Sequence, residues 1–299
     1  MLKVVLTGAS GQLGKTLIET KPESINLFTP NRSEIDLSTP EKSKSYIEKI
    51  NPDWIINTAA FTNVDGAEKE KELSFCINGK APGILANFLK NSQGRLLQIS
   101  TDFVFNGNKN IPYTNLDKPN PINVYGQSKL LGEREVLKFK KNVVIRTSWL
   151  YSPYGRNFLK TILRLHHLKY ESNEPLRVIS DQIGCPTSCK SLSDACWGIV
   201  QKGANFRNNI FHWSDYGVAS WYDFAVAIGE LAKEKLIIDN YAKVEPIKTE
   251  EYPTPANRPN FSLMNCENIY DELHIKPKHW RNSLSEVLDQ LKIGNWSFE

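Results

Sequence analysis

The chain has 299 residues, of which 40% are hydrophobic and 23% are charged, which is typical of a folded globular protein and excludes collagen-like, low-complexity and disordered classes. Its 37 basic and 33 acidic residues give a net charge of +4; they form no block of like charges, so we expect no nucleic-acid partner. No apolar stretch nears the roughly 18 residues of a membrane span, and the chain start lacks the pattern of a secretory leader.

Strands and helices alternate through the first half of the chain. Runs of β-branched and apolar residues predict strands at residues 3–7, 25–29, 54–56, 95–100 and 143–145. Helices are predicted at residues 12–20, after a Ser-Thr-Pro start at 38–40, at 68–91 and at 124–138. Parallel strands need long crossovers, which these helices supply. The pattern therefore predicts an α/β fold, a Rossmann-type doubly wound parallel sheet.

After residue 150 the alternation loosens, with more loops, prolines and aromatic residues. Helices are predicted at residues 158–170, 191–202, 221–231 and 283–291, and in the third of these Trp221, Phe224 and Ile228 share one apolar face. We expect residues 1–150 to form a nucleotide-binding domain. Residues 151–299 should form a smaller region that mainly binds the substrate. We expect this region to be discontinuous, so that some of its strands or helices can belong to the first domain.

The first motif is a glycine-rich turn between the first strand and the first helix, at residues 8–14. Glycine permits a tight turn and a close approach of a pyrophosphate, and the helix start offers unpaired N–H groups to that anion. The pattern favours a dinucleotide; the alternative is a glycine-rich turn without a ligand.

The choice of coenzyme depends on the end of the second strand. An NAD site usually has an acid there for the ribose 2′-hydroxyl, whereas this chain has Asn31 and Arg32 and no acid before Glu34. Arg32 is suited to a 2′-phosphate, which favours NADPH, with NADH left as the alternative. The other interpretation is a solvated surface arginine.

The second motif is Tyr125 followed by Lys129, a spacing that places the phenol and the ammonium on one helix face. Thr101 and Asp102 follow the fourth strand, at the edge where ligands of parallel sheets bind. A phenol that exchanges protons near neutral pH needs its pKa lowered by roughly 3 units. A lysine cation about 4 Å away supplies roughly that much, so we expect Lys129 to lower the pKa of Tyr125.

These motifs, together with Asn57-Thr58-Ala59-Ala60 after the third strand, resemble the extended short-chain dehydrogenase/reductase family. Finer segments are similar to the members that reduce dTDP-4-keto-6-deoxy sugars, and these segments lie at residues 60–65, 100–105, 146–149, 181–187 and 258–259. The resemblance covers nearly the whole chain.

The resemblance implies a set of site residues. Thr101, Tyr125 and Lys129 would be catalytic, with Tyr125 the proton donor. Thr101, Asp102, Trp149 and Arg258 would contact the substrate. Besides Tyr125 and Lys129, the cofactor would contact Gly8, Ser10, Gly11, Gln12, Leu13, Asn31, Arg32, Asp36, Leu37, Ala59, Ala60, Phe61 and Thr62. A helix-start role for Asp36 and a core role for Trp149 stay open as alternatives.

The implied function is NADPH-dependent reduction of the C4 keto group of a dTDP-4-dehydro-6-deoxy sugar, with that dTDP-sugar as substrate. A dehydratase is disfavoured because Phe103 follows Asp102 where related dehydratases have a glutamate. Two alternatives remain open: another sugar-nucleotide reductase or epimerase, and a non-catalytic regulatory subunit of the same fold, like that of methionine adenosyltransferase.

The residues at three possible metal-binding positions and the five cysteines bear on metal binding and on the cellular compartment. Some family members bind Mg²⁺ at a dimer contact through three glutamates, and this chain has Thr16, Lys190 and, less certain in register, Gln290 at the matching places. Mg²⁺ prefers carboxylate oxygens, so we expect no metal and a monomer or a metal-independent homodimer. Five cysteines without a Cys-x-x-Cys pair suit a reduced, cytoplasmic protein.

Overall fold

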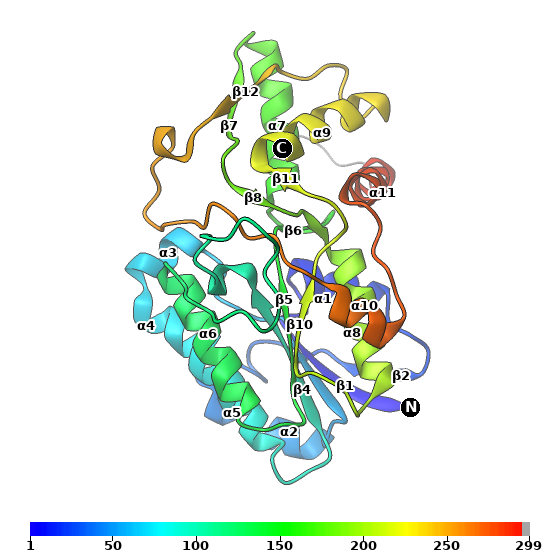
Figure 1. The fold of residues 1–299 in the computed structure, drawn as a ribbon. Helices are drawn as coiled ribbons and strands as arrows, with labels where there is room; N and C mark the ends of the chain where they lie inside the picture. Colours follow the sequence, from blue (N-terminus) through cyan, green and yellow to red (C-terminus); the bar gives the residue numbers. More distant parts are fainter. Residues whose placement is uncertain (295–299) are drawn as a thin grey trace.

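The computed structural model describes residues 1–294 and is built around a six-stranded sheet (Figure 1). The strand order is β10-β5-β4-β3-β1-β2, and every pair of neighbours is parallel. The strands are β1 (Leu2–Thr7), β2 (Ile25–Phe28), β3 (Trp54–Asn57), β4 (Arg95–Thr101), β5 (Val143–Thr147) and β10 (Ile210–Trp213). The predicted Rossmann-type fold is thereby confirmed.

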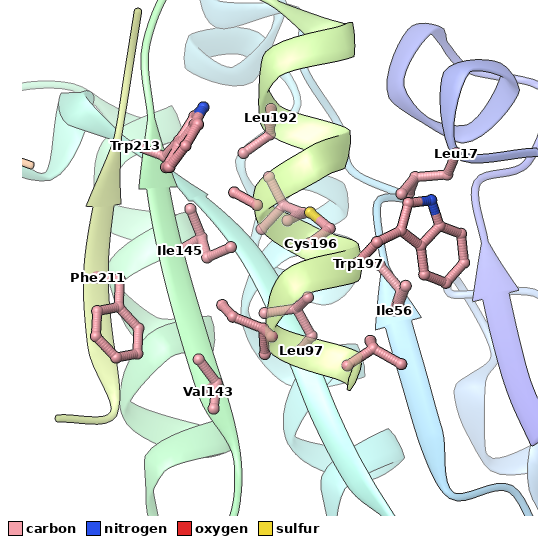
Figure 2. Close-up of a cluster of buried hydrophobic side chains, with 14 of the residues drawn as sticks. Leu17, Ile56, Leu97, Val143, Ile145, Leu192, Cys196, Trp197, Phe211 and Trp213 are labelled. Atoms are coloured by element: carbon pink, nitrogen blue, oxygen red, sulfur yellow. The ribbon is translucent and has the colours of Figure 1, made fainter. Parts of the chain in front are cut away.

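One face of the sheet is covered by α1 (Gln12–Glu19), α8 (Cys189–Lys202) and α10 (Glu267–Leu273). Alternate strand residues such as Val4 and Leu6 point to this side, as the period of a strand requires. Figure 2 shows Leu192 and Cys196 of α8 among the strand residues of this core, with Trp197 extending beside Leu17 of α1. The helix prediction at 191–202 was thus correct, and the helix begins two residues earlier.

The other face packs against α2 (Lys44–Ile50), α5 (Ala81–Phe88) and α6 (Val124–Leu137), with the 3-10 turn η1 (Pro40–Ser43) leading into α2. Its core combines strand residues Val5 and Ile55 with Ile47, Leu85 and Val136 from the three helices. A sheet buried on both faces explains why its strands read as continuous apolar runs.

The predicted helix at 68–91 is divided in the structure. It consists of α3 (Val64–Lys69), α4 (Lys71–Ser74), the π-helical segment η2 (Phe75–Lys80) and α5. Pro82 has no N–H, so the Asn78 carbonyl loses its α-helical donor. A Cβ on Gly132 of α6 would lie 2.2 Å from that carbonyl oxygen. The π segment therefore lies where proline interrupts the helix and a neighbouring helix approaches its backbone.

A smaller group of elements lies beyond one end of the sheet (Figure 1). Three helices share its core: α7 (Phe158–Glu171), α9 (Trp221–Glu234) and α11 (Trp280–Ile293). Around them are three two-stranded sheets, β7 (Leu176–Ile179) with β12 (Val244–Ile247), β8 (Ile183–Gly184) with β11 (Ala219–Ser220), and β6 (Leu150–Tyr151) with β9 (Thr187–Ser188). Short 3-10 turns occur at η3 (Asp102–Val104) and η4 (Thr249–Glu251).

The second half of the chain also contributes to the main sheet. β10 extends the sheet beside β5, and α8 packs against α1. The division near residue 150 stays a prediction about domains. Among the described residues, no helix is long and apolar enough to cross a bilayer.

Candidate active site

The glycine-rich turn joins β1 to α1 and leaves the start of the helix accessible. Gly8 has a φ of +73°, a conformation that favours glycine. A Cβ on Gly14 would lie 2.2 Å from the Gly8 carbonyl oxygen, so only glycine permits this close packing. Gly11 is the N-cap, no side chain caps the helix, and its first turn carries no acid. An anion can therefore bind the backbone N–H groups without displacing a protein group.

The Tyr125–Lys129 pair is brought to the end of β4 by close helix packing. The Asn123 side chain caps α6 by accepting a hydrogen bond from Gly126 N at 2.8 Å. A Cβ on Gly126 would lie 2.1 Å from the Phe103 carbonyl oxygen, which shows how closely α6 approaches η3. Thr101 caps η3, and its side chain interacts with the Tyr125 phenol. These contacts place the phenol beside Thr101.

Burial changes the acidity of both residues of the pair. Desolvation raises the pKa of Tyr125 to about 12, an effect that the Thr101 hydrogen bond opposes and the Asp102 charge adds to. Burial lowers the pKa of Lys129 to about 8, although the Glu133 charge opposes the shift. The predicted lowering of the Tyr125 pKa by Lys129 was therefore wrong for the protein alone. Desolvation dominates, and the Lys129 ammonium instead donates to the Ile99 carbonyl oxygen at 2.6 Å.

Asp102 is buried at the same place. Its Oδ1 accepts a hydrogen bond from the Thr101 hydroxyl at 3.1 Å, its Oδ2 makes no close hydrogen bond among the described residues, and the Ser262 side chain also acts on the carboxylate. Desolvation raises the pKa of Asp102 to about 6. Asp102 lines the cavity described below, so its carboxylate is suited to accept a hydrogen bond from a hydroxyl group of a ligand.

One cavity of about 1150 Å³ connects the glycine-rich turn with Tyr125, Lys129, Thr101 and Asp102. It lies at the carboxyl ends of the strands, where ligands of doubly wound sheets bind. Phe61 is the one predicted site residue absent from its lining, and its backbone N–H donates to Asn78 Oδ1 at 2.8 Å. The other predicted residues that line the cavity are Gly8, Ser10, Gly11, Gln12, Leu13, Asn31, Arg32, Asp36, Leu37, Ala59, Ala60, Thr62, Trp149 and Arg258.

Arg32 and Asp36 lie at the cavity margin and face each other. The Arg32 side chain is 79% exposed, and its Nε lies 3.6 Å from Asp36 Oδ1. Hydrogen bonds from Ser38 hold the pKa of Asp36 below its usual value. The pair thus offers a cation with an acid beside it, and the role of Arg32 in coenzyme choice stays a prediction.

The structure adds Trp221 to the predicted Trp149. The two indoles are stacked with ring centroids 3.5 Å apart, and both line the cavity. Trp149 has a φ of +48°, which is unusual for a large residue. The periodicity of α9 placed Trp221 on an apolar core face. Its position directly after the N-cap Ser220 is the one sequence feature that distinguishes it from the other residues of that face.

Further contacts position side chains at the cavity. Arg258 is paired with Asp65 at 2.8 Å. Gln12 Oε1 accepts hydrogen bonds from Ser152 and Asn157, so the glycine-rich turn is tied to the loop after β6. The sequence analysis missed Asn157 and also Arg156, which lines the same cavity.

Two of the three residues at the expected metal positions make side-chain contacts within the protein. The Thr16 hydroxyl donates to the Gln12 carbonyl oxygen, and the Lys190 ammonium pairs with Asp194. Residues 1–294 contain no group of three or more His, Cys, Asp or Glu side chains that could hold a metal ion. Independence from Mg²⁺ stays a prediction.

Comparisons with known proteins agree with this arrangement. The family model of the RmlD substrate binding domain matches residues 2–293. A dTDP-4-dehydrorhamnose reductase from Sinorhizobium fredii is 36% identical, over 96% of this chain and 97% of the relative.

Two solved structures have a TM-score of 0.88. One is a dTDP-4-dehydrorhamnose reductase from Clostridium acetobutylicum, 33% identical, with 97% of this chain and all of that chain covered. The other is a dTDP-4-dehydrorhamnose reductase from Bacillus anthracis in complex with NADP, 32% identical, with 97% and 99% covered. The chain therefore belongs to the RmlD substrate-binding-domain family and, within it, to the dTDP-4-dehydrorhamnose reductases.

Proposed function

We propose that the chain reduces the C4 keto group of dTDP-4-dehydrorhamnose to give dTDP-L-rhamnose, with NADPH as the reductant. The observation that carries the proposal is that a single cavity contains the open helix start, the Tyr125–Lys129 pair and the buried Asp102. Membership of the reductase family supports the same reaction.

The residues present fit a dinucleotide. The uncapped start of α1 suits a pyrophosphate, because Gly11 leaves the first N–H groups accessible. Arg32 would hold the 2′-phosphate, and Lys129 the nicotinamide ribose. NADPH, when bound, supplies the hydride that reduces the carbonyl carbon.

Tyr125 is the proposed proton donor to the carbonyl oxygen. A pKa of about 12 keeps its phenol protonated at neutral pH, which is the form that a donor needs. Proton transfer leaves a tyrosinate, which the Lys129 cation on the same helix face would stabilise once the bound cofactor and sugar bring the two groups together. The Asp102 carboxylate would accept a hydrogen bond from a sugar hydroxyl, and the Trp149–Trp221 stack would form an apolar wall for the sugar.

Phe103 argues against sugar-nucleotide dehydration at this site. Its ring packs edge-on against Tyr125, with centroids 5.8 Å apart. Elimination of water needs a group that removes a proton, and phenylalanine has none. A reductase is favoured because it needs one proton donor, which Tyr125 provides.

The test is an NADPH-oxidation assay with the 4-keto sugar nucleotide formed enzymatically from dTDP-glucose. We expect loss of NADPH absorbance that depends on both the sugar nucleotide and the protein. A folded chain that binds NADPH but leaves its absorbance unchanged would instead support a non-catalytic regulatory subunit.

A further inference from the structure

Behind the proposed catalytic pair, a buried ion pair joins α6 to β5. Glu133 follows Lys129 by one helical turn, and its carboxylate accepts hydrogen bonds from Arg146 Nε at 2.9 Å and Nη2 at 2.7 Å. Both side chains are 2% exposed. Such two-pronged arginine–carboxylate contacts fix orientation strongly, so the pair constrains α6 relative to the sheet.

The same carboxylate also holds the end of β4. Glu133 Oε1 accepts a hydrogen bond from the Ser100 hydroxyl at 2.5 Å. One turn earlier, Lys129 donates to the carbonyl oxygen of Ile99. Two residues four apart on α6 thus bind two successive residues of β4, immediately before Thr101. Ser100 lines the active-site cavity and Glu133 does not.

We propose that Glu133 and Arg146 are positioning residues that hold Lys129 and the end of β4 in the geometry that the reduction requires. The inference rests on the proposed function. Neither residue lines the active-site cavity. The pair therefore acts through Lys129 and Ser100.

The Glu133–Arg146 pair also affects whether Lys129 carries a charge. Tyr125 faces Lys129 from the preceding turn of α6, Asp102 follows the end of β4, and Arg146 extends from β5. Beyond Arg146, burial lowers the pKa of His212 on β10 to about 3, so this ring is neutral. Glu133 is thus the acid that favours the charged form of Lys129, and it offsets the cation of Arg146.

Removal of both members tests the inference without leaving an unpaired buried charge. The double variant Glu133→Met/Arg146→Met should fold, because apolar residues often replace a buried ion pair without loss of stability. Its kcat should fall at least tenfold with little change in KM for the sugar nucleotide. The alkaline limb of its kcat profile should move to lower pH, because the variant lacks the Glu133 charge that favours the Lys129 cation.

Glu135→Gln is the matched control, since Glu135 lies on the same helix and pairs with Lys138 near the surface. It should leave kcat, the pH profile and NADPH binding, followed by fluorescence, at wild-type values. If the double variant does not fold, Ser100→Ala removes one hydrogen bond of the network and should lower kcat by a smaller factor.

An inactive wild-type protein would contradict the proposed function rather than this inference. With an active wild type, a folded double variant with wild-type kcat and pH profile would overturn the positioning role, and unchanged kinetics in Ser100→Ala would do so where that variant is used.

Discussion

At the scale of single residues, sequence spacing predicted which side chains lie at one cavity, but burial determines the pKa values of these side chains. The i, i+4 spacing of Tyr125 and Lys129 placed both at one cavity. The spacing could not reveal that desolvation would dominate the pKa values of both residues, since burial depends on contacts from η3 and β4. Trp221 shows the same limit, because a helix-face pattern does not distinguish a core aromatic from one that lines a cavity.

The proton-donor role predicts the effect of removing one hydroxyl. Tyr125→Phe should lower kcat by roughly 10²-fold or more, the usual contribution of general acid catalysis, and should bind NADPH nearly as well as wild type. Lys129→Ala should also weaken NADPH binding. Steady-state kinetics and fluorescence titration provide the check, and wild-type turnover by Tyr125→Phe would refute the assignment.

The buried Lys129 predicts an alkaline limb in the activity. Since the pKa of Lys129 is lowered to about 8, its cation is lost as the pH rises through that value, and kcat should decline above it. Tyr125 stays protonated in this range. Lys129→Arg keeps its charge at every accessible pH, so its kcat, although lower, should not decline there. The same decline in both proteins would assign the limb to another group.

Coenzyme choice depends on Arg32. An interaction of the guanidinium with the 2′-phosphate is worth about 1.5 to 3 kcal/mol, so Arg32→Ala should raise KM for NADPH about tenfold or more and spare NADH. The nearby Asp36 repels a phosphate, and Asp36→Asn should therefore lower KM for NADPH. Equal effects of Arg32→Ala on both coenzymes would show that Arg32 is a surface charge only.

At the scale of elements, long periodic segments were predictable and short or interrupted ones were not. The 14-residue helices α7 and α8 were located within a few residues of their bounds. Strands of two residues, such as β6 and β9, are too short to show a period. The π segment η2 arises from the local effect of Pro82 and from the contact of Asn78 with Gly132, which periodicity does not record.

The contact between η2 and α6 predicts a sensitive glycine. Gly132→Ala places a methyl group 2.2 Å from the Asn78 carbonyl oxygen unless the helices separate. Overpacking of this kind costs about 1–3 kcal/mol. Urea denaturation should show the loss, while Gly294→Ala, whose nearest added contact is 3.4 Å away, should remain near wild type. Equal stability of Gly132→Ala and wild type would mean that the two helices can separate at no cost.

At the scale of the whole molecule, the cavity is built from both halves of the chain. The glycine-rich turn and Tyr125 come from the first half, and Asn157, Trp221 and Arg258 come from the second. The family resemblance identified Arg258 but not Asn157 or Trp221. Their places depend on how α7 and α9 pack at the end of the sheet, which is a tertiary property.

Metal dependence concerns the whole molecule, because the Mg²⁺ site of some family members lies at a contact between two copies of the chain. With Thr16 and Lys190 at two of the three expected positions, and with Gln290 aligned less securely beside Glu286 and Asp289, we expect no functional Mg²⁺ site. Dialysis against EDTA should leave the reductase activity and the mass from light scattering unchanged. Lost activity, or a dimer that dissociates on chelation and returns with Mg²⁺, would contradict this expectation.

The central claim is tested most directly by identifying the product. Proton NMR of a mixture of the chain, NADPH and dTDP-4-dehydrorhamnose should show dTDP-L-rhamnose, with one NADPH consumed for each sugar reduced. A folded chain that binds NADPH while the keto sugar persists unchanged would contradict the account.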